Sequence, residues 1–252
     1  MTGQNKNKAK KQRLDLLLVE RSLAESREKA QAIIFAGQVL INGQKQDKAG
    51  ALVPVDAEIR ILGETLRYVG RGGLKLEAAL KEFHVPVHGK IALDVGASTG
   101  GFTDCLLQHG VQKVYAVDVG YGQIAWKLRQ DPRVMVIERV NIRDMAPSLI
   151  AEPVDVAVID VSFISLEKVI PSVLNFLKPE AMIVALIKPQ FEVGREQVGK
   201  GGIVRDETAR TMAVKKVEDF VRGVGLEVKG IISSPITGQD GNVEYLICAI
   251  KC

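Results

Sequence analysis

A strand followed at once by a glycine-rich turn constrains this chain most. The apolar run Ile91 to Leu93 leads into Asp94, and the turn Gly96-Ala-Ser-Thr-Gly-Gly101 comes directly after. Phe102 to Leu107 then has the pattern of a helix start. A strand, a glycine turn and a helix form the first unit of an α/β sheet that binds a nucleotide. The turn therefore predicts a cofactor site at the carboxyl end of this strand.

Strand and helix patterns alternate from Lys90 to the end of the chain. Alternation of this kind predicts a parallel sheet with helices on both faces, in a Rossmann-like α/β fold of seven strands. The expected strands span residues 91–94, 114–118, 134–138, 154–160, 182–187, 227–233 and 244–250.

Composition excludes several classes of protein. The chain has 252 residues, of which 46% are hydrophobic and 25% charged, as in soluble globular proteins. It contains no apolar run of about 18 residues, so we expect no membrane-spanning helix. The N-terminus lacks the apolar core of a secretion signal. The three cysteines have neither disulfide nor metal-ligand spacing, which indicates a cytoplasmic protein without a metal.

The excess positive charge lies in the first quarter of the chain. Residues 1–60 contain 11 Lys and Arg against 7 Asp and Glu, and the remaining residues contain 23 of each kind. We interpret residues 1–12 as a basic disordered tail. A local basic patch favours a polyanionic partner, with nucleic acid first and a membrane surface second. The alternative is a charged tail that serves only solubility.

The sequence pattern of residues 13–62 predicts a small α+β domain. A leucine cluster in residues 13–21 indicates one helix, and Ser26 is placed to cap a second. Gly37 is placed to end that second helix in a left-handed conformation. Asn42-Gly43 predicts a tight turn between two strands, and a further strand is expected at residues 58–62.

This domain resembles the RNA-binding module named after ribosomal protein S4. The resemblance rests on Arg13-Leu-Asp15, Ser26-Arg-Glu-Lys-Ala30, Gly37-Gln-Val39 and Ile41-Asn-Gly43. It implies that Arg13, Arg27 and Lys29 face RNA. The alternative is that they are ordinary solvated residues.

Glycines and arginines fill the next segment, Arg67-Tyr-Val-Gly-Arg-Gly-Gly73. We interpret residues 63–73 as a flexible basic linker, with Arg71 as a further RNA contact. A helix is expected to begin at Leu74, so that the second domain spans residues 74–252.

The cofactor is predicted from what surrounds the glycine turn. Asp118 ends the second strand, where a carboxylate hydrogen-bonds ribose hydroxyls in both NAD and S-adenosylmethionine sites. The turn lacks the Gly-x-Gly-x-x-Gly spacing for a pyrophosphate, and Asp94 would repel one. Both points favour S-adenosylmethionine. The alternative is a glycine turn used only for packing.

The loop after the third strand is expected at the adenine end of this site. Asn141 would bond the adenine edge and Ile142 would cover a face, although Asn141 has an alternative role as a helix cap. The predicted cofactor-binding residues are Asp94, Gly96, Ser98, Gly100, Gly101, Phe102, Asp118, Asn141, Ile142 and Asp160.

Five further motifs carry a resemblance to a known family. They are Gly70-Arg-Gly-Gly-Leu-Lys-Leu76, Asp94 to Asp104, Asp160-Val-Ser-Phe-Ile-Ser-Leu166, Leu186-Ile-Lys-Pro-Gln-Phe-Glu192 and Gly241-Asn-Val-Glu-Tyr245. Over nearly its whole length, the chain resembles the TlyA family. Members of that family are known both as hemolysins and as ribosomal-RNA 2′-O-methyltransferases. The resemblance implies an S4-like domain followed by a methyltransferase domain of the FtsJ type.

The FtsJ type uses a Lys-Asp-Lys-Glu tetrad, and the matching residues are Lys75, Asp160, Lys188 and Glu244. Asp160 and Lys188 each follow an apolar strand, at the edge where open α/β sheets bind ligands. Pro189 would stop the strand directly after Lys188. A ribose 2′-hydroxyl needs a proton acceptor, and Lys188 could take this role with Lys75 as its positive neighbour, but the sequence leaves open which lysine is the base. The alternative is four unconnected surface ion-pair residues.

The sequence thus predicts S-adenosylmethionine-dependent 2′-O-methylation of ribose, at cytidine, in ribosomal RNA or ribosomal subunits. Two alternatives remain at this stage. One is a ribosome-associated RNA-binding factor without catalysis, and the other is a membrane-active hemolysin.

Overall fold

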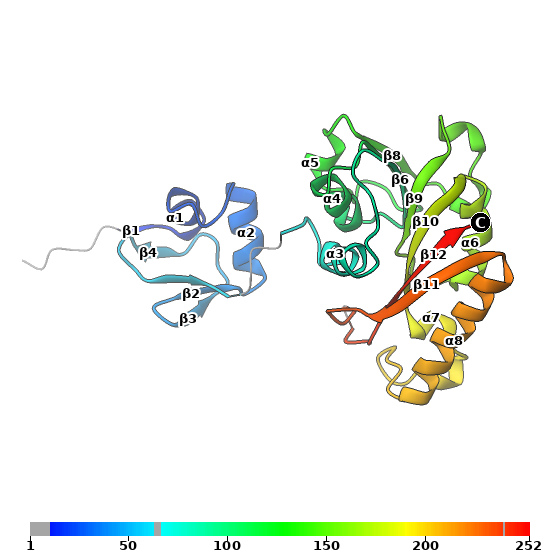
Figure 1. Ribbon diagram of the computed structural model, residues 1–252. Coiled ribbons are helices and arrows are strands. Elements are labelled where there is room, and N and C mark those ends of the chain that lie inside the picture. Colours follow the sequence, from blue (N-terminus) through cyan, green and yellow to red (C-terminus); the bar gives the residue numbers. More distant parts are fainter. Residues whose placement is uncertain (1–10, 63–66, 239) are drawn as a thin grey trace, which may run out of the picture. The chain divides into compact units, whose positions relative to one another are not determined.

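The computed structural model describes residues 11–62, 67–238 and 240–252. The chain divides into two compact units, residues 1–65 and residues 66–252 (Figure 1). Most of the predicted tail 1–12, and residues 63–66 of the predicted linker, lie outside the described residues. Within the described ranges, no helix is long and apolar enough to cross a membrane, and no cluster of His, Cys, Asp and Glu is arranged to hold a metal ion.

The N-terminal unit packs two helices against short strands. Its apolar core includes Leu14, Leu17, Leu18, Ala30 and Ile34, all buried. The elements are β1 (Lys11–Arg13), α1 (Leu14–Glu20), α2 (Arg27–Phe35), β2 (Val39–Ile41), β3 (Gln44–Gln46), β4 (Leu52–Pro54) and β5 (Ile59–Ile61). Strands β3, β2 and β5 form one antiparallel sheet in that order, and β1 pairs with β4. Because β1 begins at Lys11, the last two residues of the expected tail belong to a strand.

Three local predictions for this unit are confirmed. The Ser26 hydroxyl accepts a hydrogen bond from the Lys29 backbone N–H at 3.3 Å and so caps α2. Gly37 has a φ of +66° just after that helix. Asn42 and Gly43, with φ of +49° and +80°, form the turn between β2 and β3.

A buried carboxylate holds the two predicted RNA-facing arginines of this unit. Asp15 is fully buried and accepts hydrogen bonds from Arg13 Nη2 at 2.8 Å and Arg27 Nε at 2.9 Å. Gln31 Nε2 donates to the same carboxylate at 3.1 Å. The Arg13 hydrogen bond is the largest influence that holds the pKa of Asp15 well below its usual range. The side chains of Arg13 and Arg27 stay 43% and 50% exposed, so each arginine is fixed yet open to a partner.

The larger unit is built on a seven-stranded sheet, as predicted. Its order is β11-β12-β10-β9-β6-β7-β8. The strands are β6 (Ile91–Val95), β7 (Lys113–Asp118), β8 (Val134–Glu138), β9 (Val154–Ile159), β10 (Leu177–Ile187), β11 (Leu226–Ser233) and β12 (Tyr245–Lys251). The expectation of a wholly parallel sheet is wrong in one place, because β12 runs antiparallel to both neighbours. The described residues between β11 and β12 form no crossover helix, which a parallel connection requires.

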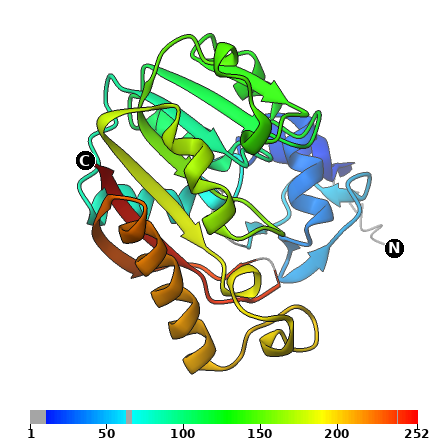
Figure 2. The same ribbon diagram turned by 90° about the vertical axis from the view of Figure 1, so that its right-hand side faces the viewer.

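Helices cover both faces of this sheet (Figure 1 and Figure 2). Strand side chains point alternately to the two faces, so Ala92 and Leu93 of β6 belong to different apolar clusters. Ala92 lies in the cluster with Leu106, and Leu93 in the cluster with Val217. One face carries α3 (Gly72–Glu82), α4 (Gly101–Gln108) and α5 (Trp126–Arg129), and the other carries α6 (Ile170–Leu174) and α8 (Glu207–Gly223).

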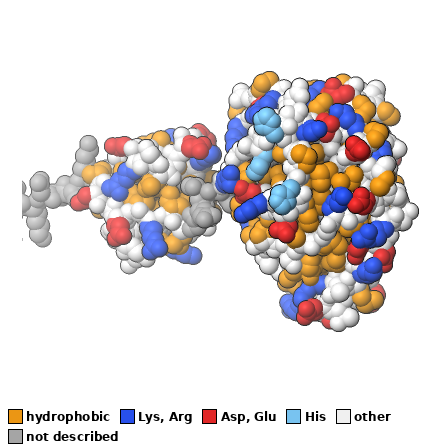
Figure 3. All heavy atoms as spheres, in the orientation of Figure 1, with side chains coloured by type: hydrophobic (Ala, Val, Ile, Leu, Met, Phe, Trp, Pro, Cys, Tyr) orange, Lys and Arg blue, Asp and Glu red, His pale blue; other side chains and the backbone are white. Residues whose placement is uncertain are grey.

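Acidic and basic side chains are interspersed on the face of the larger unit that Figure 3 shows. This mixture agrees with the equal numbers of acidic and basic residues beyond residue 60. The surplus of basic residues therefore belongs to the N-terminal part of the chain.

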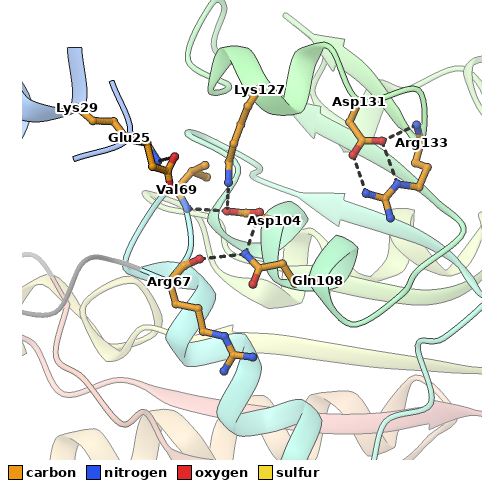
Figure 4. A network of polar contacts seen from close by, with 9 residues as sticks. All are labelled: Glu25, Lys29, Arg67, Val69, Asp104, Gln108, Lys127, Asp131 and Arg133. Carbon is orange, nitrogen blue, oxygen red and sulfur yellow. Dashed lines mark hydrogen bonds and ion pairs between the residues drawn. The ribbon is translucent and has the colours of Figure 1, made fainter. Parts of the chain in front are cut away.

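The described part of the expected linker is packed rather than free. The Val69 backbone N–H donates to Asp104 at 2.8 Å, and Lys127 Nζ lies 3.0 Å from the same carboxylate (Figure 4). Gln108 Nε2 donates to both Asp104 Oδ1 and the Arg67 carbonyl. These contacts tie residues 67–69 to α4 and α5.

Helix α3 begins at Gly72, two residues before the predicted start at Leu74. A Cβ atom on Gly73 would lie 2.3 Å from Cγ of Tyr68, whose ring is 2% exposed. Gly73 therefore serves close packing and not the flexibility expected of it.

The Gly73→Ala variant tests this packing. The added methyl group collides with a buried ring, so we expect a loss of about 1–3 kcal/mol in the free energy of unfolding. Gly223→Ala is the matched control, because its Cβ would meet nothing within 4 Å at the end of α8. The control should be neutral or stabilising by about 0.5 kcal/mol. Urea unfolding of both variants measures the difference, and equal stabilities would contradict the packing role.

The Asp15→Asn variant tests the buried carboxylate. A lowered pKa means that the ionised form stabilises the fold above the unfolded value of about 3.9 and that this contribution is lost as the pH falls below it. We therefore expect faster hydrogen exchange in residues 11–62 of the variant at pH 7, with the difference from the unmodified protein shrinking below about pH 4. Asp47→Asn, at an exposed position, is the control. A difference that is constant with pH would contradict the charge-based account.

Candidate active site

One cavity of about 520 Å³ lies at the edge of the sheet where β6, β9 and β10 end. Its walls come from the starts of α3 and α4, from the residues that follow β9 and β10, and from the segment before β12. Lys75, Asp160, Lys188 and Glu244 all line it. The fold thus brings the four residues of the predicted tetrad into one cavity from positions up to 169 residues apart.

The tetrad residues form two ion pairs of different depth. Lys75 Nζ donates to Glu244 Oε2 at 2.5 Å, and the two side chains are 10% and 3% exposed. Lys188 Nζ lies 2.6 Å from Asp160 Oδ1, and these side chains are 12% and 23% exposed. Each ammonium is therefore paired with one carboxylate, and the Lys188 pair is the more accessible.

The backbone fixes the Lys188 pair from two adjacent parallel strands. Asp160 follows β9 and Lys188 follows β10, and the two strands are paired up to Ile159 and Ala185. Lys188 is the N-cap of α7 (Pro189–Glu192), whose first residue is Pro189. The prediction that the proline ends the strand is confirmed. Two paired strands and the start of a helix fix the backbone at Lys188. The lysine side chain therefore has little freedom of direction.

The glycine turn has left-handed residues at three alternate positions. Gly96, Ser98 and Gly100 have φ of +85°, +48° and +96°. A Cβ on Gly96 would lie 2.4 Å from the Asp160 carbonyl oxygen, and one on Gly100 would lie 2.2 Å from Leu128 Cδ1. The first glycine thus lets the turn approach the β9 loop, and the second lets α5 pack behind it. Gly96, Ser98, Gly101 and Phe102 line the cavity.

Asp94 lies beneath this turn with one oxygen unpaired. It is fully buried, and its Oδ2 accepts a hydrogen bond from the Thr103 hydroxyl at 2.6 Å. Its Oδ1 has no hydrogen-bond partner among the described residues. Burial raises the pKa of Asp94 to about 7, and the negative charge of Asp160 acts in the same direction. A buried carboxylate of this kind favours a cationic ligand close by.

Five of the predicted cofactor residues do not line the cavity, namely Asp94 and Gly100 of the turn region and also Asp118, Asn141 and Ile142. Asp118 accepts hydrogen bonds from the backbone N–H groups of Ser98 at 2.7 Å and of Gly120 at 2.6 Å, and so joins the glycine turn to the next loop. Asn141 caps a short helical turn by accepting from the Arg143 N–H at 3.1 Å, the alternative role considered above. Ile142 is buried in the apolar cluster that contains Leu93.

Four residues that follow β9 and β10 line the cavity although they are not among the predicted site residues. Phe163 is 91% exposed with a φ of +63°, and its ring lies 5.1 Å from that of Phe191. Ser162 and Gln190 complete this group, which follows β9 and β10 directly. Their place beside Asp160 and Lys188 in the sequence was the available signal, since residues after parallel strands gather at one edge.

The predicted RNA-facing residues are divided between the two units. Arg13, Arg27 and Lys29 belong to the N-terminal unit, where Lys29 Nζ pairs with Glu25 at 2.5 Å (Figure 4). Arg71 lines the cavity of the larger unit and donates to the Thr237 carbonyl at 3.1 Å.

Comparisons with known proteins agree with both units. Residues 68–251 match the FtsJ-like methyltransferase family, and residues 12–59 match the S4 domain. The 16S/23S rRNA (cytidine-2′-O)-methyltransferase TlyA of Mycobacterium tuberculosis (strain ATCC 25618 / H37Rv) is 45% identical over 240 residues, which are 95% of this chain and 90% of the relative. Hemolysin A of Brachyspira hyodysenteriae is 44% identical over 93% of this chain and 98% of its own.

Solved structures give the same result. A protein from Streptococcus thermophilus is 46% identical, with a TM-score of 0.75 over 96% of this chain and 89% of its own. A SAM-dependent methyltransferase from Aquifex aeolicus shares only the fold, with 20% identity and a TM-score of 0.51 over 73% of this chain and 95% of its own. With an S4 domain followed by an FtsJ-like methyltransferase domain, and with relatives this similar along nearly its whole length, the chain belongs to the TlyA family.

Proposed function

We propose that this protein transfers a methyl group from S-adenosylmethionine to a ribose 2′-hydroxyl in ribosomal RNA, at cytidine. The observation that carries the proposal is the pair of lysine–carboxylate contacts, at 2.5 and 2.6 Å, in one cavity beside the glycine turn. The M. tuberculosis relative, which is named for cytidine 2′-O-methylation of 16S and 23S rRNA, supports the choice of substrate. Ribosomal RNA as substrate implies a cytoplasmic protein.

The residues around the turn fit S-adenosylmethionine. The unpaired buried Oδ1 of Asp94 suits a ligand that brings positive charge, which this cofactor carries on its sulfonium and amino groups. Gly96 and Gly100 have left-handed backbone conformations and carry no side chain. The space that a side chain would fill at these positions therefore stays free. On the cavity side, the cofactor would be held by Gly96, Ser98, Gly101, Phe102 and Asp160. The other predicted cofactor residues would lie behind or beside it: Asp94, Gly100, Asp118, Asn141 and Ile142. When bound, the cofactor supplies an activated methyl group.

The tetrad supplies the remaining chemistry. A ribose 2′-hydroxyl stays protonated at neutral pH, so transfer is helped by a proton acceptor beside a well-aligned oxygen. In its unprotonated form, Lys188 would accept that proton at Nζ, and Asp160 would hold the amine and stabilise the resulting ammonium. The Lys75–Glu244 pair would place a fixed positive group in the same cavity, which favours negative charge on the reacting oxygen.

The N-terminal unit would bring the RNA to this site. Arg13 and Arg27 present half-exposed guanidinium groups that Asp15 holds in place, as bidentate phosphate contacts require. Lys29 on the same helix as Arg27, and Arg71 at the cavity, would add further phosphate contacts. These contacts are sequence-independent, so selection of the target nucleotide would come from the shape of the folded RNA.

The Lys188→Ala variant tests the proposed function. Loss of the proton acceptor should lower the rate of methyl transfer to unmethylated ribosomal RNA by about 10²–10⁴-fold. Labelled S-adenosylmethionine measures the rate, and mapping of 2′-O-methyl sites identifies the product. Lys215→Ala, on the exposed side of α8, is the control and should keep the rate of the unmodified protein. Full transfer by Lys188→Ala would remove this residue as the base, and absence of transfer by the unmodified protein would favour an RNA-binding factor.

The raised pKa of Asp94 predicts how cofactor binding depends on pH. Positive charge on the cofactor favours the carboxylate, so binding below about pH 7 should release a proton and the affinity should fall as the pH decreases from 8 to 6. Calorimetry in buffers of different ionisation enthalpy measures the proton. Asp94→Asn should bind more weakly at pH 8 and lose this pH dependence. A proton uptake in the unmodified protein would contradict the assignment.

A further inference from the structure

Lys188 and Lys75 are held in different ways. Lys75 Nζ donates a hydrogen bond to a carboxylate, Glu244 Oε2, at 2.5 Å. Lys188 Nζ also lies close to a carboxylate, Asp160 Oδ1 at 2.6 Å, as an ion pair, but that oxygen accepts no hydrogen bond from the described residues. Within the described residues, the hydrogen bond of Lys188 goes instead to the hydroxyl oxygen of Ser162, at 2.8 Å.

We propose that Ser162 is a positioning residue that orients the Lys188 amine for proton transfer. The inference rests on the proposed function and adds a residue to the tetrad. Ser162 lines the same cavity as Lys188 and Asp160 and is exposed to it. It acts through Lys188 and not on the methyl group.

The number of hydrogens on the amine explains the effect. An unprotonated lysine amine has two N–H groups and one lone pair. If Ser162 accepts a hydrogen bond from one N–H and Asp160 attracts the other, the lone pair is the part of the amine that remains to face the cavity. The ammonium that forms after proton transfer would keep both contacts. Orientation of this kind raises the rate because the acceptor is already aligned with the hydroxyl.

A serine suits this task better than a second carboxylate. A hydroxyl oxygen accepts a hydrogen bond without adding negative charge, so it fixes the direction of Nζ while stabilising the ammonium less than a carboxylate does. Glu244 already provides a hydrogen-bonded carboxylate at Lys75. Ser162 therefore adds a direction to the Lys188 amine without adding a second negative charge beside that of Asp160.

The position of Ser162 is set by the backbone of the β9 loop. The Asp160 N–H donates to the Val95 carbonyl at 2.9 Å, which joins this loop to the end of β6. The Asp160 carbonyl packs against Gly96, where even a Cβ atom would collide at 2.4 Å. A loop fixed at Asp160 places Ser162, two residues later, in register with Lys188 at the end of the next strand.

Methyl-transfer kinetics of the full-length Ser162→Ala and Ser162→Thr variants test the inference. The substrates are S-adenosylmethionine and unmethylated ribosomal RNA from cells that lack this protein. We expect Ser162→Ala to lower kcat about tenfold with unchanged KM for both substrates, the effect of about 1.4 kcal/mol on the barrier. Ser162→Thr keeps the hydroxyl and should stay within about threefold of the unmodified protein. Ser172→Ala, on α6 and outside the cavity lining, is the matched control for serine replacement.

Each outcome decides between positioning and another role. An unchanged kcat in Ser162→Ala overturns the inference, as does a raised KM with unchanged kcat, which would indicate substrate binding. An equal loss in Ser162→Ala and Ser162→Thr overturns it too, because the hydroxyl would then not matter. Thermal unfolding midpoints equal to that of the unmodified protein are expected for both variants. Absence of methyl transfer by the unmodified protein would overturn the proposed function itself, whereas an active protein with an unaffected Ser162→Ala variant would overturn only the role of this serine.

Discussion

The close approach of the glycine turn to the end of β9 is the contact on which the cavity depends. The Asp160 N–H donates to the Val95 carbonyl at 2.9 Å, and Gly96 packs directly on the Asp160 carbonyl. Any side chain at position 96 would push these two loops apart. The proposed cofactor residues of the glycine turn lie on one loop. Asp160, the ion-pair partner of Lys188, lies on the other. Both sides of the proposed reaction are therefore held at a spacing that one backbone contact sets.

Two lysines in one cavity are stable here because each has a carboxylate partner. Burying an unpaired ammonium is costly, and the pairs differ in how far they are removed from water. Glu244 and Lys75 lie deep, whereas Asp160 and Lys188 are more open. The deeper pair gives the cavity a permanent arrangement of charge, and the more open pair lies where a large substrate can reach it. The same solution recurs in the N-terminal unit, where Asp15 holds Arg13 and Arg27 at the surface.

Much of the fold follows from local patterns in the sequence. Ser26, Gly37 and Asn42-Gly43 specify caps and a turn through their own backbone preferences, and the seven strands follow from short apolar runs. The antiparallel direction of β12 was missed because nothing within a strand records its direction. The packing of residues 67–73 was missed for a related reason. Glycines that allow flexibility and glycines that allow close contact look alike until Tyr68 is seen against Gly73.

The sequence by itself determined the kind of site, because a glycine turn between a strand and a helix, with Asp160 and Lys188 after two later strands, leaves few other arrangements. Its resemblance to a known family also predicted the four residues of the tetrad. Only the tertiary structure decided which lysine meets which carboxylate, that Asp94 keeps an unpaired buried oxygen, and that Ser162 accepts the Lys188 hydrogen bond. Those facts depend on distances between residues as many as 169 positions apart, and only the packing of strands side by side fixes such distances.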